Sequence, residues 1–217
     1  MTASPNRPAR PIKLHRFALS GHCHRVELLL SMLGLPCEFI DVDLAAGEHK
    51  RPAFLALNAF GQVPVIEDGA LVLADSNAIL VYLALHYGPP GQWLPQAPAA
   101  AAEVQRWLSA AAGPLAFGPA AARVTQLFKR PGDPAESIGR AHALLAVMEQ
   151  TLAQQPYLAG AEPTLADIAN YSYTAHAPEG HVSLADYPAV RAWLGRIEAL
   201  PGFVPMARSP RPEQAPA

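Results

Sequence analysis

Cysteine is scarce in this chain of 217 residues, which contains only Cys23 and Cys37. A small secreted domain that relies on disulfides needs a denser set of cysteines, so we expect folding in the reducing cytoplasm. The first eleven residues, MTASPNRPARP, lack the apolar segment of a secretory signal, which agrees with that expectation. No apolar run of about 18 residues is free of charges or helix breakers, so no membrane-spanning helix is expected.

Charge of either sign is also low. Lys and Arg number 16 against 18 Asp and Glu, and charged residues make up 16% of the chain. The net charge of -2 provides no basic surface of the kind that attracts nucleic acid or an anionic membrane. Hydrophobic residues make up 51%, and a chain of this length can bury a sizeable core. We therefore expect a globular, helix-rich protein with no nucleic-acid or membrane partner.

The first half, residues 12–88, alternates between strand and helix patterns. The predicted elements are strands at 12–17 and 40–44, helices at 25–34 and 52–57, a β-hairpin within 63–73 and a helix at 75–88. Asp68-Gly69 between two apolar runs is the signal for the hairpin. Asp75 or Ser76 is expected to cap the last helix, and Gly88 to end it. The predicted order is therefore β-α-β-α-β-β-α.

The second half contains only helix patterns. It follows a Pro- and Gly-rich stretch, GPPGQWLPQAP, at 88–98. Asp133 precedes Pro134 at a predicted helix start, and Thr164 with Asp167 forms a capping box. We expect a disordered extension over 1–11, a first domain over 12–88, a linker over 89–98, an all-helical domain over 99–207 and a disordered tail over 208–217.

Four motifs in this order resemble the cytosolic glutathione transferases. They are SGHCHRVELLLSMLGLP, GQVPVIEDG, LADSNAILVYLA and PTLADIA, and the resemblance extends over roughly residues 12–205. It implies an α/β thioredoxin-like domain followed by an all-α domain, with glutathione as co-substrate and no metal. It also implies a homodimer and a small hydrophobic electrophile as second substrate. No tyrosine occurs between Lys13 and Pro36, so the first loop is closest to the serine-dependent bacterial classes.

Ser20 lies where the first predicted strand gives way to the first helix. Free N–H groups and the positive dipole end favour an anion there, and a hydroxyl donor lowers the pKa of a thiol from about 8.5 toward about 6–7. The resemblance assigns activation of the glutathione thiol to Ser20, and a plain helix cap is the alternative. Cys23 is interpreted as a packed residue, with mixed-disulfide chemistry left open. A metal site at His22, Cys23 and His24 is disfavoured, because successive helical side chains point about 100° apart.

The resemblance also implies which residues hold the rest of glutathione. They are His49, Lys50, Gln62, Val63, Pro64, Asp75 and Ser76. Val63 precedes a proline that resembles the family's cis-proline, and its backbone would pair with the cysteinyl part like an added strand. Asp75 and Ser76 would hold the γ-glutamyl group, and His49 and Lys50 would face the glycyl carboxylate. Strand start, helix cap and exposed loop are the structural alternatives at these positions.

The second substrate is expected between the first loop and the helices after the linker. The candidate lining residues are Trp107, Ala111, Leu115, Phe117, Tyr173 and His176. Phe60 matches an aromatic residue that inserts into the partner subunit in some classes, although a core position is the commoner outcome. The expected activity is attack of the glutathione thiolate on a hydrophobic electrophile. Glutathione-dependent disulfide or peroxide reduction, isomerisation, and a non-catalytic binding module of the same fold remain as alternatives.

Overall fold

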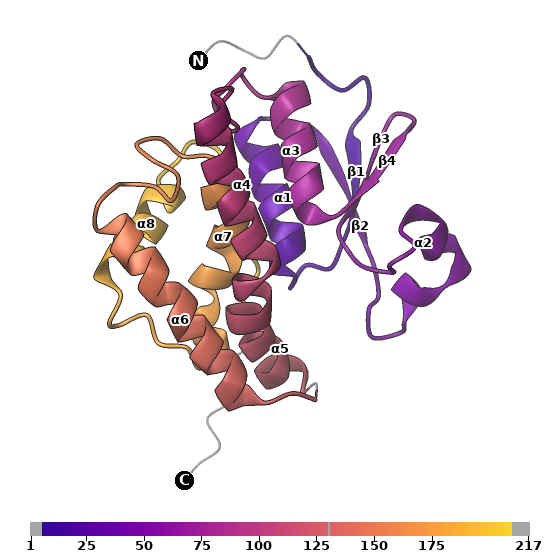
Figure 1. Ribbon diagram of the computed structural model, residues 1–217. Coiled ribbons are helices and arrows are strands. Elements are labelled where there is room, and N and C mark those ends of the chain that lie inside the picture. The colour runs from indigo at the N-terminus through magenta and orange to yellow at the C-terminus, as the bar shows by residue number, and fades with distance from the viewer. Residues whose placement is uncertain (1–5, 130, 210–217) are drawn as a thin grey trace.

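The computed structural model describes residues 6–129 and 131–209 (Figure 1). Its strands are β1 (Ile12–Arg16), β2 (Cys37–Asp41), β3 (Val65–Asp68) and β4 (Leu71–Ala74). Its α-helices are α1 (Gly21–Met32), α2 (Pro52–Leu57), α3 (Ser76–Tyr87), α4 (Pro98–Ala112), α5 (Ala121–Phe128), α6 (Pro134–Leu152), α7 (Leu165–Ala175) and α8 (Pro188–Glu198). The short turns are η1 (Glu48–Lys50), the π-helical η2 (Ala116–Ala120) and η3 (Ala177–Gly180).

The first half forms a four-stranded mixed sheet in the order β2-β1-β3-β4. Strand β1 runs parallel to β2 and antiparallel to β3, and β3 pairs antiparallel with β4. The parallel pair requires a crossover, which α1 supplies, whereas β3 and β4 are joined by the predicted tight turn at Asp68-Gly69. The β-α-β-α-β-β-α order is confirmed, and the fold is the thioredoxin-like domain followed by helices.

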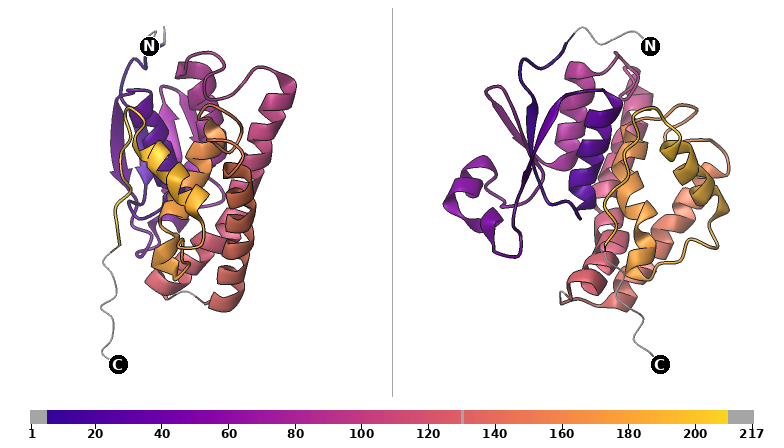
Figure 2. Two further views of the ribbon diagram at one scale, coloured as in Figure 1. Left: turned by 90° about the vertical axis from the view of Figure 1, so that its left-hand side faces the viewer. Right: turned by 180° about the vertical axis from the view of Figure 1, so that it is seen from behind.

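Helices α1 and α3 lie between the sheet and the helical half, whereas α2 lies on the other side of the sheet (Figure 1). The view from behind shows α7 directly beside α1 (Figure 2). One buried apolar cluster runs through both halves, with Leu14 in β1, Leu29 in α1, Trp107 in α4 and Trp193 in α8. The two halves therefore share a core, which fixes the first loop against the helices.

Local signals account for most element boundaries. Asp75 caps α3 by accepting from the amides of Asn77 and Ala78, and Gly88 ends that helix. Asp133 caps α6, with Pro134 in the first helical position. In the capping box of α7, Thr164 and Asp167 exchange bonds as predicted. A side-chain cap satisfies amide groups that the helix itself leaves unpaired, which stabilises the fold by about 1 kcal/mol for each cap.

Two predicted elements of the first half were displaced. Helix α1 begins at Gly21 rather than at residue 25, because Ser20 caps it and satisfies its first turn. Strand β2 ends at Asp41, so the alternation at 40–44 was not a strand pattern throughout. Val42 and Leu44 alternate inward because they pack with Phe54 of α2 in a small second cluster. Burial, and not strand pairing, produced that part of the pattern.

Residues at both limits of the described range contact the body of the protein. The Asn6 side chain donates to the His86 carbonyl at 3.3 Å, and Ser209 is buried against α5. Asn6 and Ser209 lie in the stretches 1–11 and 208–217, which were expected to be disordered. The rest of that prediction, for 1–5 and 210–217, lies outside the described residues. Within residues 6–129 and 131–209, no helix is both long and apolar enough to cross a bilayer.

Candidate functional site

Three segments far apart in the sequence meet at one edge of the sheet. Val65 at the start of β3 is opposite His15 in β1 and Ala74 in β4. The loop after β1, the residues before β3 and those after β4 are therefore neighbours. The Ser76 hydroxyl ties the third segment to α1, because it lies 3.3 Å from Arg25 Nη1 and 3.5 Å from His22 Nδ1. Strand register thus brings the predicted site segments together.

Ser20 occupies the N-cap position of α1. Its backbone is extended, with φ -92° and ψ 118°, and its Oγ accepts from the Cys23 amide at 3.4 Å. A hydroxyl that accepts in this way still has a proton to donate, and the unpaired amides and dipole of the helix start favour an anion nearby. The next residue, Gly21, packs against the ring of Tyr173 in α7. The start of α1 is therefore in direct contact with the helical half of the chain.

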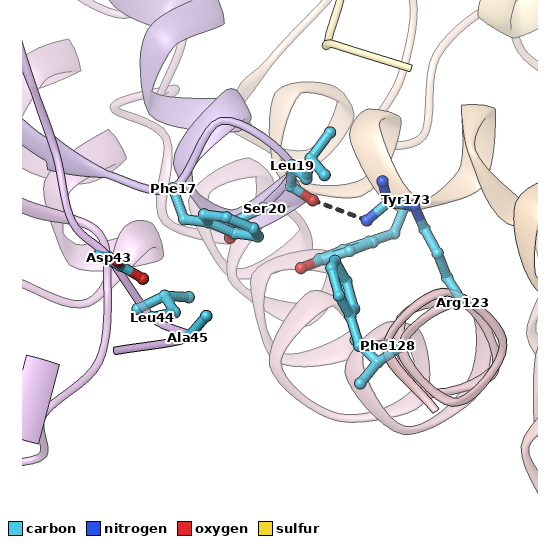
Figure 3. A pocket seen from close by; sticks show the side chains of 10 residues that line it. Phe17, Leu19, Ser20, Asp43, Leu44, Ala45, Arg123, Phe128 and Tyr173 are labelled. Atoms are coloured by element: carbon cyan, nitrogen blue, oxygen red, sulfur yellow. Dashed lines mark hydrogen bonds between the residues drawn. The ribbon is translucent and has the colours of Figure 1, made fainter. Parts of the chain in front are cut away.

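Ser20 lies on the wall of a cavity of about 480 Å³ between the two halves (Figure 3). The other lining residues are Phe17, Leu19, Asp43, Leu44, Ala45, Arg123, Val124, Phe128 and Tyr173. Three aromatic rings and four aliphatic side chains make most of this wall apolar. An apolar cavity with few polar groups is typical of a small-molecule site.

The start of α3 offers a second anion-favouring end beside the loop. Asp75 has φ 73°, a left-handed backbone conformation that is strained for a residue with a side chain. Such strain is concentrated at ligand-binding positions. Asp75 is exposed, and its Oδ1 caps the helix, whereas Ser76 is buried beneath Arg25. The helix start therefore combines backbone donors, a carboxylate and a hydroxyl.

Before β3, the Val63–Pro64 bond is cis, as the resemblance implied. Gln62 is exposed just ahead of it, and its carbonyl accepts from the Asn58 side chain at 2.8 Å. The ammonium of Lys50 donates to the Gly61 carbonyl at 2.9 Å, which fastens η1 to this segment. His49 lies half-buried in η1. These side chains border the same edge of the sheet from the α2 side.

Comparisons with known proteins agree with this geometry. Residues 11–85 match the family described as "Glutathione S-transferase, N-terminal domain", and residues 108–201 match "Glutathione S-transferase, C-terminal domain". Glutathione S-transferase 3 of Zea mays is 41% identical over 212 residues, which cover 89% of this chain and 91% of that protein. The chain belongs to the glutathione S-transferase family. It is a glutathione transferase with glutathione as its co-substrate.

Solved structures give the same result for this transferase. A glutathione S-transferase from Pseudomonas fluorescens Pf-5 matches with a TM-score of 0.85 at 36% identity, covering 92% of this chain and all of that one. A glutathione transferase homologue from Drosophila mojavensis with bound glutathione matches with a TM-score of 0.78 at 29% identity. The match covers 88% of this chain and 89% of the Drosophila mojavensis chain.

The polar cluster after Ser20 in this transferase is divided among different partners. Burial, with the nearby Arg25 charge, lowers the pKa of His22 to about 3, and its ring packs edge-on against Tyr173. Cys23 Sγ accepts from the Phe17 amide, and burial raises the pKa of its thiol to about 12. His24 bonds Ser172 and the Val204 carbonyl. These three side chains do not converge on a shared ion.

The cavity beside Ser20 has largely different walls from the pocket predicted for the second substrate. Of the predicted residues only Tyr173 lines the cavity. Trp107, Ala111 and Leu115 are fully buried in the core that joins the halves, and the exposed Phe117 and the half-buried His176 do not line it either. A helix face that packs against α7 has the same apolar pattern as one that lines a cavity, so the sequence did not separate them.

Several lining residues carried no distinctive signal in the sequence. Phe17 directly precedes the first loop of the transferase, and that position is the one clue that was available. Arg123, Val124 and Phe128 come from α5, whose start follows the π-helical turn η2 with Pro119 inside it. That turn rotates the helix face by an amount that residue spacing does not predict.

Proposed function

We propose that Ser20 activates the glutathione thiol and that the cavity holds an apolar, ring-containing electrophile for the thiolate to attack. The observation that supports this is the position of Ser20, which caps α1 and also lines the cavity. A sulfur beside Ser20 would receive the hydroxyl proton in a hydrogen bond and lie near the positive end of α1. Both interactions stabilise the thiolate over the thiol and lower its pKa.

The reaction then needs no group beyond the two substrates. The thiol proton leaves to water, and the sulfur lone pair forms a bond to an electrophilic carbon in the cavity. The leaving group departs with the bonding electrons, or, in an addition, the adjacent carbon takes a proton from water. Stabilising the thiolate before attack is pre-organised electrostatic catalysis.

We infer that the remaining site residues hold the tripeptide around Ser20. The backbone of Val63, before Pro64, would pair with the cysteinyl unit. The amide and hydroxyl of Ser76 at the start of α3 would bind the γ-glutamyl carboxylate, and Asp75 would accept from its ammonium group. Lys50 is the stronger candidate for the glycyl carboxylate because it carries a charge, with His49 and Gln62 beside it. A ligand held at several points loses only a small part of its binding free energy when one contact is removed.

The state of Cys23 favours conjugation over mixed-disulfide chemistry. Disulfide exchange requires an accessible thiolate, whereas the Cys23 side chain is fully buried and its pKa is raised to about 12 by burial.

We also propose that the enzyme works in the cytoplasm as a homodimer. Phe60 supports the dimer, because its side chain is 81% exposed at the tip of the loop before β3. An isolated aromatic of that exposure is costly to leave in water and suits an interface.

The test compares Ser20→Ala with Cys23→Ser. Loss of a donor aimed at developing charge typically lowers turnover by about 10²–10³-fold. Because the α1 dipole and amides remain, we expect a fall near 10² with an unchanged dissociation constant for glutathione and a higher pKa of the bound thiol. Cys23→Ser should keep near-normal turnover, since its hydroxyl can still accept from the Phe17 amide. Turnover retained by Ser20→Ala and lost by Cys23→Ser would refute the assignment.

A further inference from the structure

Arg123 of α5 is a charged residue buried at the wall of the cavity. Only 1% of it is exposed, yet its guanidinium has partners in three separate segments. Nη1 donates to the Leu19 carbonyl at 2.7 Å, Nε donates to Glu179 at 2.6 Å, and Nη2 donates to Ser209 at 2.9 Å. Figure 3 shows the bond to Leu19 beside Ser20. The first loop, η3 and the C-terminal segment therefore meet on one side chain.

The bond to Leu19 acts directly on the backbone of Ser20. The Leu19 carbonyl belongs to the same rigid peptide plane as the Ser20 nitrogen, so fixing the carbonyl oxygen also fixes the position of that nitrogen. That nitrogen donates back to the Phe17 carbonyl at 2.9 Å, which closes the loop into a turn. The orientation of the Ser20 hydroxyl is therefore set partly by Arg123, which is 104 positions from Leu19 in the chain.

Arg123 is itself held in a defined position. An added Cβ on Gly180 would lie 2.6 Å from the backbone nitrogen of Arg123, so η3 packs backbone to backbone against α5. This contact places Glu179 against the guanidinium. Burial opposes ionisation of Glu179, but hydrogen bonds from His176 and Arg123 outweigh it and hold the pKa of its carboxyl below the usual value. The buried charge is thus paired, and its remaining donors are directed at neutral oxygens.

We propose that Arg123 is the positioning residue for Ser20: from the helical half, it fixes the Leu19 carbonyl and so directs the Ser20 hydroxyl at the glutathione sulfur. The inference rests on the proposed function, because it acts through Ser20. Catalytic hydrogen bonds depend steeply on position, and a displacement of about 1 Å can lower turnover by about 10²-fold. The bond to Ser209 makes the C-terminal segment part of the same support.

The alternative is that Arg123 only stabilises the packing of α5 against η3. Both roles would lower stability when the side chain is removed, so stability alone does not distinguish them. A positioning role predicts in addition that the pKa of the bound thiol rises and that kcat falls without a change in glutathione affinity. It also predicts that removing Arg123 no longer lowers kcat once Ser20 has been replaced by a residue without a hydroxyl.

The experiment is a double-mutant cycle of Arg123→Met and Ser20→Ala on the full chain, with kcat, glutathione affinity and the pKa of the bound thiol measured for each. We expect Arg123→Met to lower kcat by about tenfold and to raise the thiol pKa by up to one unit, with little change in affinity. In the Ser20→Ala background, Arg123→Met should leave kcat almost unchanged. Arg140→Met, at an exposed arginine of α6 paired with Glu136, is the matched control and should leave all three values unchanged.

Three results would separate the possibilities. If Arg123→Met lowers kcat equally with and without Ser20, Arg123 does not act through Ser20 and the inference is wrong. If Ser20→Ala alone is silent, the proposed function fails first. If Arg123→Met does not fold, Arg123→Lys replaces it in the cycle, because lysine keeps the charge but cannot reach three partners from one planar group. Arg123→Lys with wild-type kcat and thiol pKa would also overturn the inference.

Discussion

Phe17, just after β1, and Phe128, at the end of α5, lie with ring centroids 6.0 Å apart and planes inclined by 57°. The two rings come from different halves of the chain and both line the cavity. Tilted aromatic pairs at this separation attract one another beyond the apolar area they bury. The pair therefore joins the halves and presents an aromatic surface to whatever enters the cavity.

Removing one ring should weaken binding of the electrophile. We expect Phe128→Ala to raise KM for an aromatic electrophile by about tenfold, since the lost contacts are worth about 1.5 kcal/mol. KM for glutathione should stay the same. Phe117→Ala is the matched control, because Phe117 is 60% exposed and does not line the cavity. Steady-state kinetics with both substrates varied measures this, and equal effects of the two variants would contradict the cavity assignment.

Gly21, the first residue of α1, permits Tyr173 to lie against the first loop. A Cβ built on Gly21 would lie 2.9 Å from three atoms of the Tyr173 ring, so the ring must move in Gly21→Ala. We expect about 1–3 kcal/mol of destabilisation from overpacking, together with a higher KM for the electrophile. Denaturant unfolding and kinetics measure the two effects.

Gly139→Ala is the comparison variant, for which we expect a gain in stability rather than a loss. Gly139 is exposed within α6 and nothing lies within 4 Å of an added Cβ. Alanine there should stabilise the protein by up to about 1 kcal/mol through the gain in helix propensity, with unchanged kinetics. A stabilising Gly21→Ala would show that Tyr173 does not pack as described.

His24 should make the protein sensitive to acid. Burial between α1 and α7 disfavours a charged ring and lowers the pKa of His24 from 6.5 to about 4, although the hydrogen bond to the Val204 carbonyl acts in the opposite direction. The unfolded chain therefore binds a proton at a higher pH than the folded one does. Stability is complete above pH 6.5 and falls as the pH drops toward 4, by roughly 3 kcal/mol from this residue.

Unfolding by urea at several pH values tests this prediction. His24→Gln cannot titrate, so its free energy of unfolding should fall less steeply between pH 6.5 and 4 than that of the wild type. His86→Gln, at an exposed histidine of α3, should follow the wild-type curve. A His24→Gln profile parallel to that of the wild type would show that another group causes the acid sensitivity.

The proposed dimer makes a separate prediction about Phe60. We expect Phe60→Ala to shift the mass measured by light scattering at low micromolar concentration toward that of one chain. Truncating an aromatic anchor at an interface commonly costs about 2 kcal/mol or more, which is about 30-fold in the dissociation constant. Val147→Ala, at an exposed apolar residue of α6, is the control. A wild-type protein that is monomeric at these concentrations would remove the basis of the proposal.

The order of elements was determined by the sequence because its signals are local. A turn such as Asp68-Gly69, a cap such as Asp133 and a capping box such as Thr164 with Asp167 each act within four residues. The placement of Ser20 at the start of a helix follows in the same way, from the strand before it and the leucine pattern behind it. Short-range chemistry therefore sufficed for the fold and for the residue proposed to activate the thiol.

The composition of the cavity was decided only by tertiary structure. Periodicity marks the face of α4 that contains Trp107 as buried, but core packing and a cavity wall require the same apolar residues. Arg123 has no local signal at all, because its partners are Leu19, Glu179 and Ser209, each more than 50 residues away. The role of a buried charge depends on the groups that surround it. Only the packing of α5 against the first loop, η3 and the C-terminal segment brings those groups together.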